Sequence, residues 1–113
     1  MAGRPYDLLT LAARTTSGTA AIPADFSDED DFRVHIRVTA VSGTTPALTV
    51  SLQDSLDGGA NWATVASSAS LSTVSVHTLS LARTTPHGPM LRLSWTITGT
   101  TPSFTFETKM WAK

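Results

Sequence analysis

The chain has 113 residues and a formal net charge of −1 at pH 7, a size that suits one small domain and excludes two ordinary ones. The balanced charge argues against a general nucleic-acid binder, which would carry a basic patch, and no stretch approaches the roughly 20 apolar residues of a membrane helix. We therefore expect neither nucleic acid nor a membrane as a partner.

The composition favours strands over helices. Charged residues make up only 15% of the chain, whereas threonine and serine are abundant. Threonine is β-branched and suits a half-buried pleated surface, while the Glu, Lys, Ala and Gln typical of helix surfaces are scarce apart from alanine. Cysteine is absent, so no disulfide and no Cys-ligated metal site can form.

The N-terminal residues 1–24 show little alternation. We interpret them as an arm or an edge strand, and residues 25–113 as the domain proper. Leu9 and Leu11 alternate with Thr10, which allows a short strand. No apolar run of the signal-peptide kind follows the N-terminus, so we expect synthesis in the cytoplasm without export by the general secretory route.

An acidic cluster follows this segment. Its members are Asp25, Asp28, Glu29, Asp30 and Asp31. On a mildly basic body such a cluster is a candidate electrostatic contact, although a run of charge is more often a solvated loop. Its spacing does not fit a calcium-binding loop, so we expect no metal there.

Strict alternation of apolar and polar residues predicts strands through the rest of the chain. The predicted strands cover residues 32–40, 48–53, 62–66, 74–81, 91–98 and 104–107. Predicted turns lie at 43–46, 57–59 and 99–102. In the strand 74–81, Val74 and Val76 have one parity and Leu79 and Leu81 have the other, so we expect a bulge near His77 and Thr78 that brings all four to the same face. The pattern predicts an all-β fold: a single antiparallel β-sandwich, jelly-roll-like or immunoglobulin-like, with about seven or eight strands.

The same alternation predicts which side chains form the core. They are Val34, Ile36, Val38, Leu48, Val50, Leu52, Leu91, Leu93, Trp95, Ile97, Phe104 and Phe106. Trp111 shares the parity of the polar residues Glu107 and Lys109, so we expect it to be exposed. An exposed tryptophan is a candidate contact residue, because tryptophan is enriched at interface hot spots.

Two short motifs stand out. Residues 43–50 and 99–106 repeat a Gly-Thr-Thr-Pro turn before an apolar-Thr-apolar strand, which indicates either a true repeat or one hairpin device used twice. Ser55, Asp57, Gly59 and Trp62 have the spacing S-x-D-x-G-x-x-W and resemble the Asp-box, a hairpin motif of several unrelated β-proteins. We expect these four residues to build a turn, because Ser and Asp bond the turn backbone and Gly supplies positive φ.

Nothing in the sequence points to catalysis or to a cofactor. The three histidines, His35, His77 and His87, form no short zinc-binding pair. No G-x-S-x-G elbow is present, and no base or orienting acid can be placed by spacing. We expect a non-enzymatic protein without a cofactor.

The strand and turn phrases resemble a small structural protein of tailed bacteriophages. The phrases are residues 38–46, 52–55, 57–62, 91–95 and 99–104, so that the likeness covers roughly Phe32 to Phe106. Some proteins of this kind resemble capsid decoration proteins, which sit outside the head and clamp neighbouring capsomers. The resemblance defines no functional residues that could be carried over.

The resemblance implies a minor capsid protein on the exterior of the virion, bound to the major capsid protein. Decoration proteins are commonly trimers at local three-fold positions, so it also implies a homotrimer. We expect contacts from the N-terminal segment, the acidic cluster and Trp111. The alternative is a carbohydrate- or cell-surface-binding β-sandwich of a tail or head fibre, which an exposed aromatic platform would favour.

Overall fold

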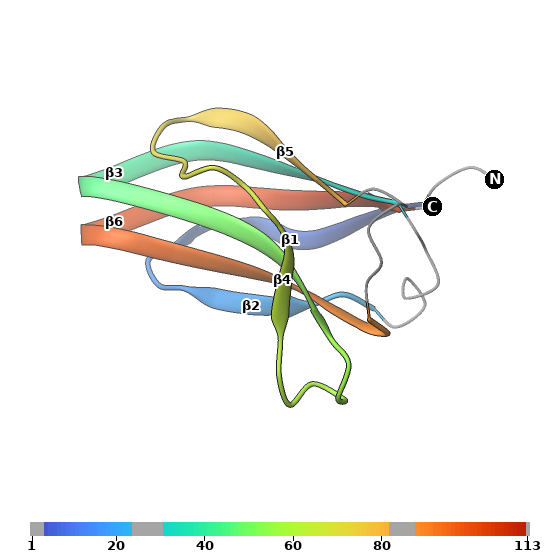
Figure 1. Cartoon of the computed structure of the whole chain (residues 1–113). Coiled ribbons are helices and arrows are strands. Elements are labelled where there is room, and N and C mark those ends of the chain that lie inside the picture. The colour runs from blue at the N-terminus through green and yellow to red at the C-terminus, as the bar shows by residue number, and fades with distance from the viewer. Residues whose placement is uncertain (1–3, 24–30, 82–87, 113) are drawn as a thin grey trace.

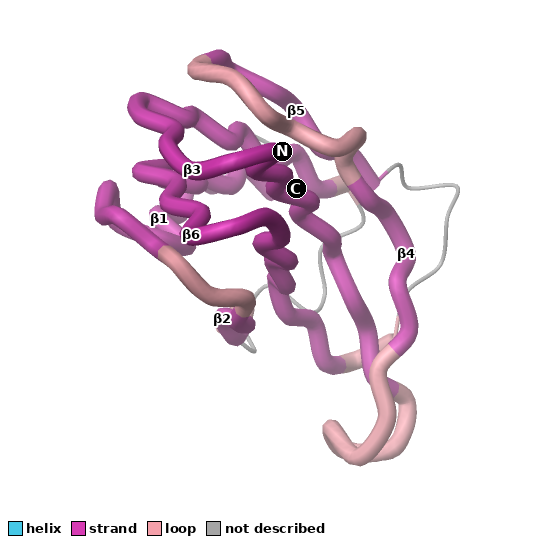
Figure 2. The backbone as a smooth tube through the Cα atoms, turned by 90° about the vertical axis from the view of Figure 1, so that its left-hand side faces the viewer, coloured by secondary structure: helices cyan, strands magenta, loops and turns pink. Residues whose placement is uncertain are grey.

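The computed structural model describes residues 4–23, 31–81 and 88–112, and every regular element within them is a strand (Figure 2). The strands are β1 (Arg4–Arg14), β2 (Gly18–Ala21), β3 (Phe32–Ser55), β4 (Ala63–Ser67), β5 (Ser75–Leu81) and β6 (Met90–Ala112). The all-β class is confirmed. The described residues form six antiparallel strands, not the seven or eight predicted.

Two long strands, β3 and β6, run antiparallel to each other and fold back together at one end of the molecule (Figure 1). Their fold divides a single sheet into two facing layers. One layer holds the first half of β3, the second half of β6, β1 and β5. The other holds the second half of β3, the first half of β6, β2 and β4. The result is a sandwich in which both layers share the same two central strands.

The corners of β3 and β6 lie where the sequence predicted two turns, at residues 43–46 and 99–102. Those predictions were wrong in kind, because the chain continues in the same paired strand and does not form a hairpin. Gly43 has φ 109° and Gly99 has φ 125°, values that favour glycine. Thr45 and Thr101 adopt φ of 46° and 45°, so both corners have the same backbone shape. The observed strands are fewer than the predicted ones because each corner joins two predicted strands into one.

The corners belong to a repeat of the whole chain. β1 pairs with the second half of β6, as β4 pairs with the second half of β3. β2 pairs with the first half of β6, as β5 pairs with the first half of β3. The order β1, β2, β3 therefore recurs as β4, β5, β6, with Thr44 paired to Thr100 at the centre. Of the two explanations for the repeated Gly-Thr-Thr-Pro motif, this pairing supports the true repeat.

One bulge breaks the symmetry of this repeat. Between Val38 and Ala40 the strand β3 advances by two residues while β6 advances only from Phe106 to Thr105. The hydroxyl of the extra residue, Thr39, donates to the Thr105 carbonyl at 3.3 Å. A one-residue insertion reverses the faces of a strand, so the inward positions before the bulge differ from their counterparts in β6.

The core fills the space between the two layers. Every predicted core residue is buried except Trp95, which is partly buried and packs against the cluster. The indole of Trp95 donates to the Thr16 carbonyl at 3.0 Å and meets the Phe106 ring edge-on, with centroids 6.3 Å apart. Burial also extends to residues that the prediction omitted: Ile22, Phe32, Leu71, Leu79, Leu81, Met110 and Ala112.

The predicted bulge at His77 and Thr78 was wrong. β5 pairs with β3 without any register shift. The apolar residues of the two parities lie on opposite faces of the strand: Leu79 and Leu81 are buried, whereas Val76 faces solvent with 62% of its surface exposed. A β-branched residue on the solvent face of a strand is ordinary and does not require an irregular backbone.

The N-terminal residues form edge strands: β1 and β2 lie at the sides of the two layers next to β6. Arg14, at the end of β1, packs over the rings of Trp95 and Phe106. Its guanidinium donates to the Phe106 carbonyl at 2.8 Å and lies 4.8 Å from the centre of the Phe106 ring. Partial burial there lowers the pKa of Arg14 from its ordinary value.

Candidate functional site

The structure describes two of the six predicted contact residues. Asp25, Asp28, Glu29 and Asp30 lie outside the described residues. Asp31 is half-buried just before β3. Trp111, near the end of β6, has 46% of its surface exposed, as its parity predicted. Trp111 is therefore the centre of the candidate site.

Trp111 lies on the outer face of the layer formed by β1, β6, β3 and β5. Its direct neighbours across the sheet are Pro5 on β1 and Arg33 on β3, and both are exposed. Directly paired residues of antiparallel strands share a face, with Cβ atoms about 4.5–5.5 Å apart. The indole is thus set in a regular sheet between two fixed neighbours, and its position does not depend on a loop.

Charged side chains continue this face along the same strands. Lys109 lies between Asp7 and His35, two residues along β6 from Trp111. Glu107 is paired with Arg37, whose Nε donates to the Glu107 carboxylate at 3.0 Å. We call this set the Trp111 surface: Pro5, Asp7, Arg33, His35, Arg37, Glu107, Lys109 and Trp111.

The Trp111 surface has a basic bias. It holds three cationic side chains, those of Arg33, Arg37 and Lys109, but only two carboxylates. One of these carboxylates, that of Glu107, already pairs with Arg37. That ion pair is half-exposed on its arginine side, so it contributes at most about 1 kcal/mol to stability. Its main effect is to orient Arg37. A sheet surface with one exposed indole and excess positive charge suits an acidic protein surface.

The predicted turn at Ser55, Asp57, Gly59 and Trp62 is formed as expected. The Ser55 hydroxyl donates to the Asp57 carboxylate at 2.8 Å and accepts from the Gly59 N–H at 2.9 Å. The other carboxylate oxygen of Asp57 accepts from the Asn61 amide at 2.7 Å. These bonds, led by the one from Asn61, lower the pKa of Asp57 to about 2. The turn is held by its own side chains.

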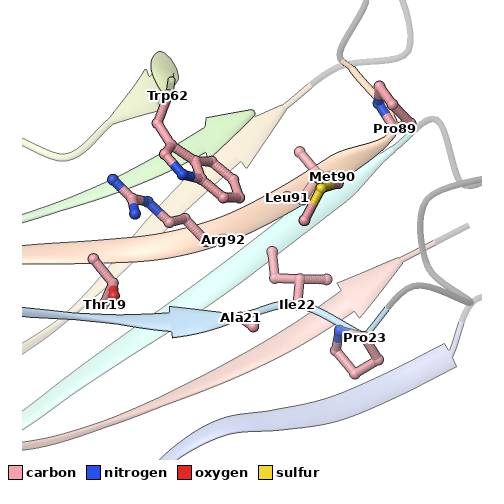
Figure 3. A pocket seen from close by; sticks show the side chains of 9 residues that line it. All are labelled: Thr19, Ala21, Ile22, Pro23, Trp62, Pro89, Met90, Leu91 and Arg92. Carbon is pink, nitrogen blue, oxygen red and sulfur yellow. The ribbon is translucent and has the colours of Figure 1, made fainter. Parts of the chain in front are cut away.

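A second feature escaped the sequence prediction: a hollow of about 260 Å³ beside Trp62, on the layer opposite to the Trp111 surface (Figure 3). Its wall is Trp62 together with Arg92, whose guanidinium carbon lies 4.3 Å from the centre of the indole ring. The alternation of residues 91–98 predicted that Arg92 points outward. It did not predict that the hairpin between β3 and β4 would fold over Arg92, because the contact between Trp62 and Arg92 joins residues far apart in the chain.

Metal-binding clusters and membrane-spanning helices are absent from residues 4–23, 31–81 and 88–112. No group of three or more His, Cys, Asp or Glu side chains there is placed to hold a metal ion. The same residues include no helix of the length and apolarity needed to cross a membrane. His35, exposed on β3, belongs to the Trp111 surface.

Comparison with known proteins gives no relative from which a function could be transferred. No protein-family model, no curated protein and no solved structure matches the chain. What the chain binds must be argued from its own surfaces.

Proposed function

We propose that this chain is a non-enzymatic structural protein of a tailed-phage virion, a decoration protein that binds the outside of the head and stabilises it. The observation that carries the proposal is the exposed Trp111 on the outer face of a regular sheet, between Pro5 and Arg33. The phage assignment itself rests on the resemblance of the strand and turn phrases. The Trp111 surface is the proposed contact with the major capsid protein.

The rigidity of this surface supports such a role. Trp111 and its neighbours belong to three adjacent strands, so little backbone entropy is lost when the surface docks. A tryptophan ring supplies a large contact area with few rotatable bonds. These properties suit a protein that binds many equivalent positions on a shell and performs no chemistry there.

The charge of the surface indicates the nature of its partner. Arg33 and Lys109 make no hydrogen bond or ion pair within the part of the chain that the structure describes. We propose that they face carboxylates of the major capsid protein around the Trp111 contact. Charged groups at the rim of an interface act mainly on the association rate and on specificity.

The proposal includes a homotrimer at local three-fold positions of the head. Since β1 and β2 are paired strands of the two layers, the N-terminal residues 4–21 contribute through the folded sandwich and not as a free arm. Contacts between copies would then come from surfaces such as the exposed edge of β1.

A protein surface is favoured over a glycan as the partner. The large exposed aromatic side chains among the described residues are Tyr6 and Trp111. Trp111 is flanked by Pro5 and Arg33, so no row of rings extends from it for successive sugars to stack upon. Glycan binding by the Trp111 surface would count against the proposal.

The experiment is a sedimentation assay with heads assembled without this protein. Wild-type protein is expected to co-sediment with heads, and Trp111→Ala and Arg33→Gln to bind more weakly. Leu56→Ala is the matched control, because Leu56 is 81% exposed on a hairpin tip away from this surface. Failure of the wild type to bind heads would overturn the proposed function. Equal binding by Trp111→Ala would overturn the assigned surface.

A further inference from the structure

The hollow beside Trp62 is shaped by three separate parts of the chain. The end of β2 contributes one side, the beginning of β6 the floor, and the hairpin between β3 and β4 the wall (Figure 3). The lining residues are Thr19, Ala21, Ile22, Pro23, Trp62, Pro89, Met90, Leu91 and Arg92. Most of them are apolar. Met90 is 41% exposed, so apolar surface is left open to a ligand.

The wall of this hollow is fixed before any ligand arrives. The Trp62 indole donates to the Gly59 carbonyl at 3.0 Å, which sets the ring plane. The Arg92 Nε donates to the Gln53 side-chain oxygen at 2.7 Å, and the guanidinium stacks on the indole. A stacked and hydrogen-bonded arginine has lost its side-chain freedom already, so binding a ligand costs it little further entropy.

The charge of the hollow comes from one group. Arg92 is the single charged residue among those that line it. Of the five N–H donors of its guanidinium, Nε–H is bonded, and the terminal nitrogens have no partner within the described part of the chain. The carboxylates of Asp54 and Asp57 lie in a separate hollow that shares Trp62 as a wall. An anionic ligand is therefore directed to the Arg92 side of the ring.

The size and lining of the hollow favour a side chain over a sugar. A volume of about 260 Å³ is below the roughly 300–1,000 Å³ of pockets for drug-sized ligands. Thr19 and Arg92 are the polar side chains of the lining apart from the indole N–H, which Gly59 already uses. A sugar would leave most of its hydroxyl groups without partners there, which is costly once they are buried. In addition, Arg92 covers one face of Trp62 on which a sugar would stack.

We infer that this hollow, the Trp62–Arg92 pocket, binds a large apolar side chain that stands beside a carboxylate in a segment of a partner protein. The apolar side chain contacts Ile22, Met90 and Leu91, and the carboxylate accepts hydrogen bonds from the terminal nitrogens of Arg92. This inference does not rest on the proposed function, because the pocket and the Trp111 surface lie on opposite layers of the sandwich.

The test is a titration of the isotopically labelled full chain, followed by nuclear magnetic resonance. The probes are N-acetyl-L-leucine, which carries the carboxylate, and N-acetyl-L-leucinamide, which lacks it. The acid is expected to shift the Trp62 indole N–H and the Arg92 Nε–H resonances. The amide is expected to bind about tenfold more weakly, the ratio expected for one hydrogen bond to a charged group.

Two variants decide whether Arg92 is responsible. Arg92→Gln is expected to bind the acid and the amide equally, while Arg33→Gln, on the opposite layer, keeps the wild-type preference. Circular dichroism and the retained Trp95 indole resonance show that each variant is folded. Equal binding of acid and amide by the wild type, shifts centred on Trp111, or tighter binding of glucuronate than of N-acetyl-L-leucine would each overturn the inference.

Discussion

Gly43 and Gly99 occupy equivalent corners of β3 and β6, and each is closed in by the backbone of the other strand. A Cβ atom on Gly43 would lie 2.7 Å from the Thr101 carbonyl oxygen, and one on Gly99 would lie 2.9 Å from the Thr45 carbonyl oxygen. Neither contact can be relieved by moving a side chain. The two corners therefore lock each other, and the fold-back of the sheet depends on both glycines.

The first prediction concerns these corners. Gly43→Ala and Gly99→Ala should each lower the free energy of unfolding by about 2 kcal/mol or more, because a left-handed φ is combined with a backbone clash. Gly58→Ala is the matched control: Gly58 has φ 74°, but apart from its two chain neighbours no residue has an atom within 4 Å of its Cβ position. It should cost only about 1 kcal/mol. Denaturant unfolding measures all three, and an equal loss in Gly58→Ala would contradict the role assigned to the clash.

The second prediction uses the unpartnered hydroxyl of Thr108. This side chain is fully buried, and its Oγ1 has no hydrogen-bond partner within the described residues. Thr108→Val keeps the shape and removes the buried polar group, so it should raise stability by about 1 kcal/mol. Thr98→Val, at an exposed position, should change stability by less than about 0.5 kcal/mol. A loss of thermal stability in Thr108→Val would show that the hydroxyl is satisfied.

The third prediction is a pH dependence. Hydrogen bonds lower the pKa of Asp57 from 3.8 to about 2 in the folded chain. Its ionised form therefore stabilises the fold above pH 3.8, and this contribution is lost as the pH falls towards 2. Asp57→Asn should melt below the wild type at neutral pH, and the gap should narrow between about pH 4 and pH 2. Thermal melts of both proteins across this range measure it.

Glu107→Gln serves as the control for that titration, because Glu107 forms only a surface ion pair with Arg37. Its melting temperature should stay close to that of the wild type throughout. A gap between Asp57→Asn and the wild type that stays constant from pH 7 to pH 2 would mean that the Asp57 charge does not stabilise the turn.

The fourth prediction tests the strand faces. Leu93 is fully buried opposite Leu52, so Leu93→Ala should cost about 2–5 kcal/mol. Val76 lies on a strand of the same sandwich with 62% of its surface exposed, so Val76→Ala should cost less than about 0.5 kcal/mol. A large loss of stability in Val76→Ala would mean that Val76 is buried, as the bulge predicted from the sequence in β5 requires.

The sequence predicted where strands lie better than how they connect. Every core residue that alternation predicted is buried except Trp95, because parity alone marks an inward side chain, but buried residues outside the clearest runs, such as Leu71 and Met110, were missed. The corners were misread as turns, since Gly-Thr-Thr-Pro ends a strand as readily as it bends one. Whether Gly43 ends or bends its strand is decided by the Thr101 backbone, more than fifty residues away.

The candidate sites show the same limit. Exposure of Trp111 followed from its parity with Glu107 and Lys109, so local sequence sufficed. The Trp62–Arg92 pocket did not follow, because it requires the β3–β4 hairpin to fold over the beginning of β6. Contacts between distant segments are set by topology, and alternation carries no information about topology.

The most direct test of the account is a cryo-electron microscopy reconstruction of the virion that carries this protein, combined with its copy number per particle. The account predicts many copies on the outside of the head at local three-fold positions, with Trp111 against the major capsid protein. Absence from the head, or a few copies confined to the tail, would contradict it.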